Sequence, residues 1–147
     1  MHPKFLRRSG VLSVVSIALV SITPASIVLS QSLEPFESPR VSETQWRIYY
    51  FEVESAHRDS LERLDAELLI RFRDRGAATV WTFTQVGHPA HPGWITRQVV
   101  DTAGQTNIRQ VGYFAGDEDA FVILFQKFLE QNKLIQERLN EQSQPGK

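Results

Sequence analysis

The chain has 147 residues, with 16 Lys and Arg, 17 Asp and Glu and no cysteine. This length suffices for one domain with its own buried core. The balanced charge disfavours nucleic acid as a partner, because phosphate binding relies on a basic surface. The absence of cysteine excludes disulfides, a lipoprotein anchor and a thiol nucleophile.

Residues 1–32 have the pattern of a secretory signal peptide. Lys4, Arg7 and Arg8 form a positive start, the apolar run 11–22 follows, and small residues come after it. We expect cleavage near Ser30–Ser32. The alternative is an uncleaved membrane anchor, because the 19 residues Val11–Leu29 carry no charge and roughly 20 apolar residues span a bilayer.

Loss of residues 1–32 would leave 13 Lys and Arg against 17 Asp and Glu, a net charge of −4. An exported domain without disulfides is more typical of a bacterial envelope than of a eukaryotic secretory route. We therefore expect a periplasmic or secreted protein. Residues 33–44, rich in Ser, Glu and Pro, are predicted to be a linker or a loosely docked arm, residues 45–142 a single domain, and residues 143–147 a disordered tail.

The domain is predicted to begin with a strand and a helix. The segment Trp46–Glu54 is rich in aromatic and β-branched residues, which favours a strand with apolar groups on both faces. The next segment starts with a capping box at Asp59 and ends at Gly76, and its apolar residues follow helical spacing. Its outer face would carry a solvated set of charges: Arg63, Glu67, Arg71, Arg73 and Asp74.

Three further strands and a long helix complete the predicted domain. Strands are expected at 78–86, 94–101 and 106–114, and a tight turn containing Gly104 should pair the last two antiparallel. The segment 117–141 has a continuous apolar stripe that includes Phe121, Phe125 and Phe128, which predicts an amphipathic helix. The expected fold is α+β: a two-layer sandwich of order β-α-β-β-β-α, with both helices on one face of a four-stranded, mostly antiparallel sheet.

The loop between the first two of these three strands, GHPAHPG at residues 87–93, holds two histidines three residues apart. Its prolines limit its conformations, so the loop would present His88 and His91 at low entropic cost. No CxxC or HExxH pattern and no nearby carboxylate completes a metal site, and no glycine-rich phosphate loop occurs. We therefore expect no metal, no cofactor and no catalytic residues.

Aromatic residues and arginines on the predicted strands are the stronger signal for binding. Exposed aromatic rings beside arginines form recognition surfaces, and tryptophan is the commonest costly residue at interfaces. The predicted binding residues are His88, His91, Trp94, Arg97, Arg109 and Tyr113. Core packing or a homodimer contact would explain the same aromatic residues.

The sequence thus indicates a small exported binding domain without catalytic activity, such as an envelope accessory, inhibitor or immunity-type protein. Its partner would be another protein or an envelope component. The alternative is a small-ligand-binding protein or hydrolase, with its site at the His88–His91 loop or between sheet and helices.

Overall fold

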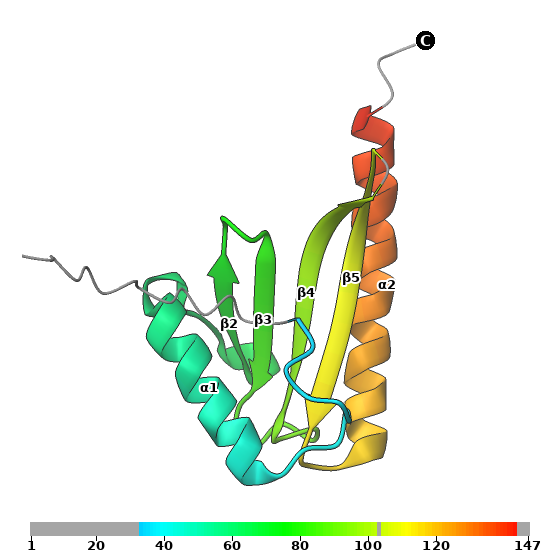
Figure 1. Ribbon diagram of the computed structural model, residues 1–147. Coiled ribbons are helices and arrows are strands. Elements are labelled where there is room, and N and C mark those ends of the chain that lie inside the picture. The colour runs from blue at the N-terminus through cyan, green and yellow to red at the C-terminus, as the bar shows by residue number, and fades with distance from the viewer. Residues whose placement is uncertain (1–32, 103, 144–147) are drawn as a thin grey trace, which may run out of the picture. The chain divides into compact units, whose positions relative to one another are not determined.

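The computed structural model describes residues 33–102 and 104–143. The predicted signal peptide or anchor and residues 144–147 of the predicted tail lie outside these residues. The described chain is α+β, with two helices and an antiparallel sheet of five strands (Figure 1). The prediction of an α+β fold is confirmed, and the predicted number of four strands was one too low.

The strands follow one another in the sheet in chain order, and every neighbouring pair is antiparallel. Their bounds are β1 Glu62–Leu64, β2 Leu69–Asp74, β3 Thr79–Thr84, β4 Gly93–Thr102 and β5 Gln105–Phe114. β4 and β5 are ten residues long and pair over their full length, from Gly93 opposite Phe114 to Thr102 opposite Gln105. The tight turn predicted between them is confirmed, with Gly104 at a φ of 78°.

The first helix, α1, covers Glu43–His57, where the sequence predicted a strand. That prediction was wrong because a capping box starts a helix at Ser42: the Ser42 side chain accepts from the Gln45 backbone N–H, and the Gln45 side chain accepts from the Ser42 N–H. Tyr49 and Val53, four residues apart, form the buried face of the helix. The apolar groups that a strand would place on both faces lie mainly along one helical stripe.

The helix predicted after Asp59 was also wrong. Short 3-10 turns at Arg58–Ser60 and Asp65–Glu67 flank β1, and Leu68 has a left-handed φ of 53° that no continuing helix tolerates. β2 then lies between β1 and β3. Its alternation places Ile70 and Phe72 on one face and Leu69 and Arg71 on the other, so pairing on both sides outweighs the helical spacing of the leucines.

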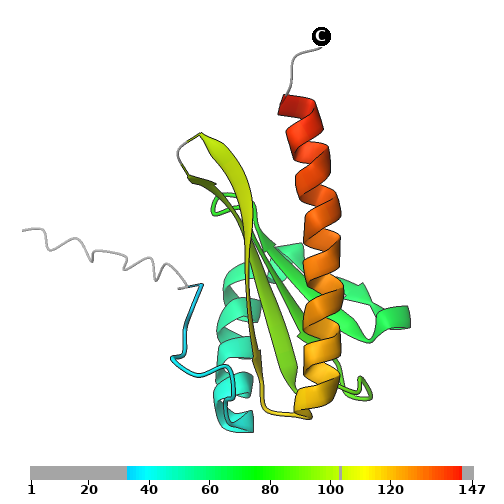
Figure 2. The ribbon, with the colours of Figure 1, turned by 90° about the vertical axis from the view of Figure 1, so that its right-hand side faces the viewer.

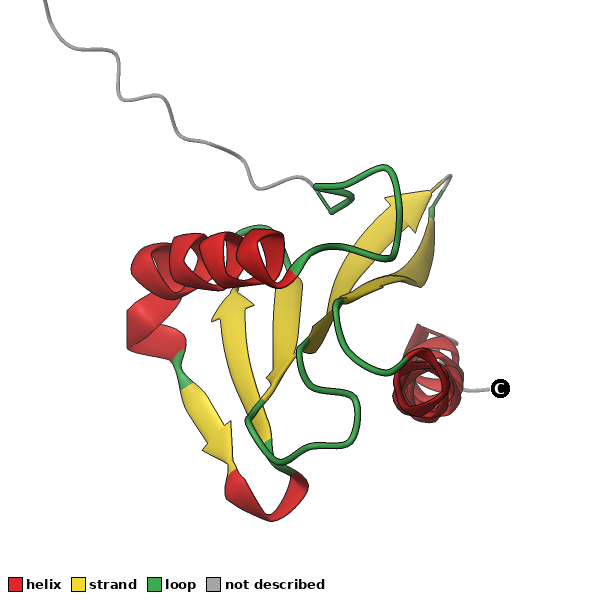
Figure 3. Cartoon of the chain, turned by 90° about the horizontal axis from the view of Figure 1, so that it is seen from below, coloured by secondary structure: helices red, strands yellow, loops and turns green. Residues whose placement is uncertain are grey.

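The two helices lie on opposite faces of the sheet, not on one face as predicted. One core contains Tyr49 and Val53 of α1, and the other contains Phe121, Leu124 and Phe128 of α2, which covers Glu118–Ser143. Figure 3 shows α1 on one side of the strands and α2 on the other. Consecutive residues of a strand lie in different cores. Ile70, Trp94 and Tyr113 belong to the core under α1, and their neighbours Leu69, Ile95 and Phe114 belong to the core under α2.

Gly112 allows α2 to lie close to β5. A Cβ atom at this position would be 2.7 Å from Cζ of Phe121 and 2.8 Å from Cδ2 of Phe125. These distances are shorter than van der Waals contact, so the absence of a side chain on β5 lets both rings pack directly on the strand.

We predict that Phe128→Ala lowers the free energy of unfolding by about 3–5 kcal/mol, because the ring is 2% exposed in the core beneath α2. Ile123→Ala is the matched control, since Ile123 is 72% exposed on the outer side of the same helix. Chemical denaturation, monitored by circular dichroism, measures the free energy of unfolding of both variants. Equal midpoints for the two variants would contradict the packing of α2 on this face.

Candidate functional site

Trp94 and Tyr113, two of the residues that the sequence selected for binding, are core residues. They are opposite each other on β4 and β5, their rings stack with centroids 4.8 Å apart, and they are 0% and 4% exposed. The Tyr113 hydroxyl donates to the backbone oxygen of Phe36 at 3.1 Å. Both rings therefore contribute to the core under α1, where no partner touches them in the folded state.

The two histidines brace the loop between β3 and β4. Nδ1 of His91 lies 3.0 Å from the backbone oxygen of Thr84, and a carbonyl only accepts, so this nitrogen carries the proton. The ring also meets Trp46 edge-on at 5.1 Å. Nδ1 of His88 accepts from the Ala90 N–H at 3.0 Å. The described residues contain no group of three potential metal ligands.

Burial lowers the pKa of His88, and the charges of Lys127 and then His91 act in the same direction. His88 is therefore neutral over a wider pH range than a free histidine.

The Thr84 hydroxyl lies 3.3 Å from Nδ1 of His91, but it also donates to the Gly93 oxygen and accepts from the Gly93 N–H. These bonds give the hydroxyl a structural role in closing the loop.

The two predicted arginines lie on opposite faces of the sheet. Arg109 forms an ion pair with Glu34, which precedes α1. Arg97 lies on the face of α2, where its guanidinium covers the Phe128 ring at 4.7 Å and donates to Oδ1 of Asn132 at 3.3 Å. The structure thus brings Trp94 into contact with Tyr113, and the His91 N–H donates to the His88 oxygen at 2.9 Å, whereas Arg97 and Arg109 lie apart on opposite faces.

The residues before α1, for which the sequence predicted a linker or a loosely docked arm, form an arm that docks on the sheet. We define the arm as residues 33–41. Phe36 packs edge-on against Tyr49, Trp94 and Tyr113 at 5.8–6.1 Å. Arg40 pairs with Glu118 at 2.7 Å, which ties the arm to the start of α2.

The outer side of β5 is an exposed strand edge. The arm occupies its last position: the Phe114 N–H donates to Pro39, and the Phe114 oxygen accepts from the Val41 N–H, both at 2.9 Å. Because backbone groups alternate in direction along a strand, Ile108, Gln110 and Gly112 direct their N–H and C=O groups the same way. Within the described residues, no backbone group pairs with these three.

A groove follows this edge between β5, the arm and α2. A hollow of about 790 Å³ lies at the arm end, and a second hollow of about 480 Å³ lies further along β5 and α2, with Gln126 in the wall of both. Figure 2 shows β5 and α2 running side by side along this course. Phe36, Val122 and Phe125 are among the apolar residues that line the larger hollow. We call the two hollows together the edge groove.

Only a faint signal of the edge groove is present in the sequence. Phe36 and Val41 stand out as apolar residues in a segment of Ser, Glu and Pro, which is the one hint that the arm docks. Which strand of the sheet lies at an edge depends on pairings between segments distant in the chain, and local residue patterns do not encode these.

We predict that His91→Ala lowers the free energy of unfolding by about 0.5–1.5 kcal/mol, because it removes the hydrogen bond to Thr84. His91→Asn, whose amide also donates, should recover part of the loss. Thermal unfolding of the parent protein and of the two variants measures these differences in stability. A variant as stable as the parent would show that the histidine does not brace the loop.

Comparisons with known proteins give no match to the chain. No protein-family model matches it, and searches of the curated proteins and of the solved structures find no match. In residues 33–102 and 104–143, no helix is both long and apolar enough to cross a membrane. The residues and the geometry described above are therefore the basis for a functional proposal.

Proposed function

We propose that this chain is an exported binding domain without catalytic activity, which recognises an extended segment of another protein by adding it as a strand to β5. The observation that carries the proposal is the run of outward backbone groups at Ile108, Gln110 and Gly112, bordered by the edge groove. Strand addition to an exposed edge is a common mode of peptide recognition, in which main-chain hydrogen bonds supply affinity.

Specificity would come from the walls of the edge groove. A strand added to β5 places alternate side chains on the two sides of the sheet. On one side they would meet the arm, with Phe36, and on the other they would meet α2, with Phe125 and the half-exposed Val122. Apolar side chains in the added segment would be buried at both walls.

The charge of the larger hollow indicates what kind of segment fits it. Its lining includes three acidic residues, Glu34, Glu37 and Glu118, and no Lys or Arg. Arg109 and Arg40, which are not among the lining residues, pair with Glu34 and Glu118. Glu37 is then the acidic residue that would meet a charge on the bound segment, and we propose a segment that combines apolar residues with one basic residue near Glu37.

The proposed cellular place follows from the N-terminal sequence. A charged start, an apolar run and small residues within residues 1–32 support export to the periplasm or beyond. The partner would then be an envelope protein or another exported protein, and the domain would serve as an accessory, inhibitor or immunity-type factor.

The test is a proline at position 108. Ile108→Pro removes a backbone N–H that points away from β4. The hydrogen bonds from β5 to β4 come from the residues on either side of Ile108, so they remain. Proline is tolerated at such positions of an edge strand. Ile108→Val keeps the N–H and is the control. We expect peptides selected on the purified protein from a random display library to bind the proline variant roughly tenfold more weakly, and the valine variant unchanged.

Amide exchange followed by NMR distinguishes strand addition from other contacts. Bound peptide should slow exchange at Ile108, Gln110 and Gly112 together. Peptides that bind the two variants equally and leave these amides unprotected would contradict the proposal. Protection that depends on protein concentration, without any peptide, would instead show that a second copy of the chain pairs along β5 as a homodimer.

A further inference from the structure

Three arginines gather on the face of the sheet that carries α2. On the face of α2, one cross-strand row runs Glu62, Arg71, Thr82 and Ile95, and the next row runs Arg73, Val80, Arg97 and Gln110. We call Arg71, Arg73 and Arg97 the arginine cluster. It comes from β2 and β4 and lies on the opposite face of the sheet from α1.

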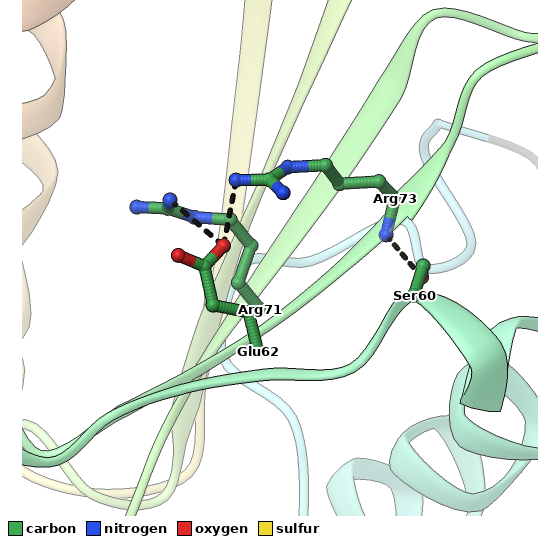
Figure 4. A network of polar contacts seen from close by, with 4 residues as sticks. All are labelled: Ser60, Glu62, Arg71 and Arg73. Atoms are coloured by element: carbon green, nitrogen blue, oxygen red, sulfur yellow. Dashed lines mark hydrogen bonds and ion pairs between the residues drawn. The ribbon is translucent and has the colours of Figure 1, made fainter.

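The carboxylate of Glu62 forms ion pairs with two arginines of this cluster. The same oxygen of Glu62, Oε2, accepts from Arg73 at 2.6 Å and from Arg71 at 3.4 Å (Figure 4). Arg97 donates to the neutral amide of Asn132 and covers an aromatic ring. Among the described residues, no carboxylate other than Glu62 lies within ion-pair distance of the cluster. Three positive charges therefore face one negative charge.

Polar atoms in the same two rows lack hydrogen-bond partners within the described chain. These atoms are Nε of Arg71, Nε of Arg97 and the hydroxyl of Thr82, all buried. The remaining atoms of this kind, on Trp46, Trp94 and Thr96, belong to residues on the α1 side. A buried donor without an acceptor costs free energy, so two unpaired N–H groups on adjacent cations define an incomplete site.

The two half-buried guanidiniums also disturb each other. Burial, and then the charge of Arg71, lowers the pKa of Arg97 to about 10. Desolvation and repulsion between like charges both disfavour the charged form, and a bound anion would relieve both effects. On α2, Lys127 is paired with Glu67 at 3.2 Å.

We propose that the arginine cluster binds an oxyanion, a carboxylate or a phosphate group, between Arg71 and Arg97. Guanidinium groups present paired N–H donors that match the oxygens of both anions. Glu62 holds Arg71 and Arg73 in place from one side, and Asn132 with Phe128 holds Arg97 from the other. Asn132 also lines the smaller hollow of the edge groove, but none of the three arginines lines either hollow, so this proposal does not depend on strand addition to β5.

The experiment follows the arginine Nε–Hε signals of the purified protein by NMR. Sodium phosphate and sodium acetate are added in separate titrations, with sodium chloride keeping the ionic strength constant. We expect saturable shifts at Arg71 and Arg97 in at least one titration. Saturation by phosphate alone would identify a tetrahedral anion as the ligand, and saturation by acetate alone would identify a carboxylate.

Substitutions then locate the site. Arg71→Gln and Arg97→Gln should each weaken anion binding roughly tenfold or more, because each removes a charge-assisted hydrogen bond. Arg63→Gln is the matched control: it removes the same charge from β1, but Arg63 pairs with Ile70 on the other face. This variant should bind as the parent does.

Two results would overturn the proposal. Shifts at Arg71 and Arg97 that rise linearly with either anion, like those of Arg63, would show only general ionic effects. An equal loss of affinity in the Arg63 control would show that total charge matters and not a built site. If a glutamine variant fails to fold, the titration of the parent protein still shows whether Arg71 and Arg97 bind the anion.

Discussion

The burial of both faces of the sheet is the constraint on which the rest of the structure depends. Consecutive residues such as Trp94 and Ile95 enter different cores, so neither face of the strand is left for solvent at that point. One helix cannot satisfy both faces. α1 must cover one and α2 the other, and the strong apolar stripes of both helices are thereby used.

α2 lies beside both candidate sites. α2 packs along β5, with Phe121 and Phe125 against Gly112, so its position borders the free edge of that strand. Arg71 and Arg73 of β2 lie on the same face of the sheet as α2. The arm closes only the last position of β5, at Phe114. The edge groove and the arginine cluster thus both include contacts with α2.

The second half of the fold could be predicted from the sequence because its signals are local. The period of Phe121, Phe125 and Phe128 indicates α2, and Gly104 indicates the turn that sets the register of β4 and β5. The first half could not. In α1, a capping interaction at Ser42 competes with the strand propensity of aromatic residues, and in β2, pairing with two neighbours competes with helical spacing.

The same physical limit applies to the sites. An apolar stripe shows that a helix has a buried side, but it does not state which face of a sheet that side meets. Arg97 was among the predicted binding residues and lies in the arginine cluster, whereas Arg71 and Arg73 were assigned to the solvated side of a helix that does not form. Bringing these three together requires the strand pairing, which depends on residues far apart in the chain.

The central claim is that the edge groove receives a segment of another protein, and site-specific photo-crosslinking in living cells tests it most directly. A photoreactive phenylalanine analogue would replace Val122, which lines the groove, or the adjacent Ile123, which is more exposed but lies outside it. The account predicts a crosslink from position 122 to an apolar, basic segment of an exported protein, and none from position 123. Equal crosslinking from both positions, or crosslinking from position 123 alone, would contradict it.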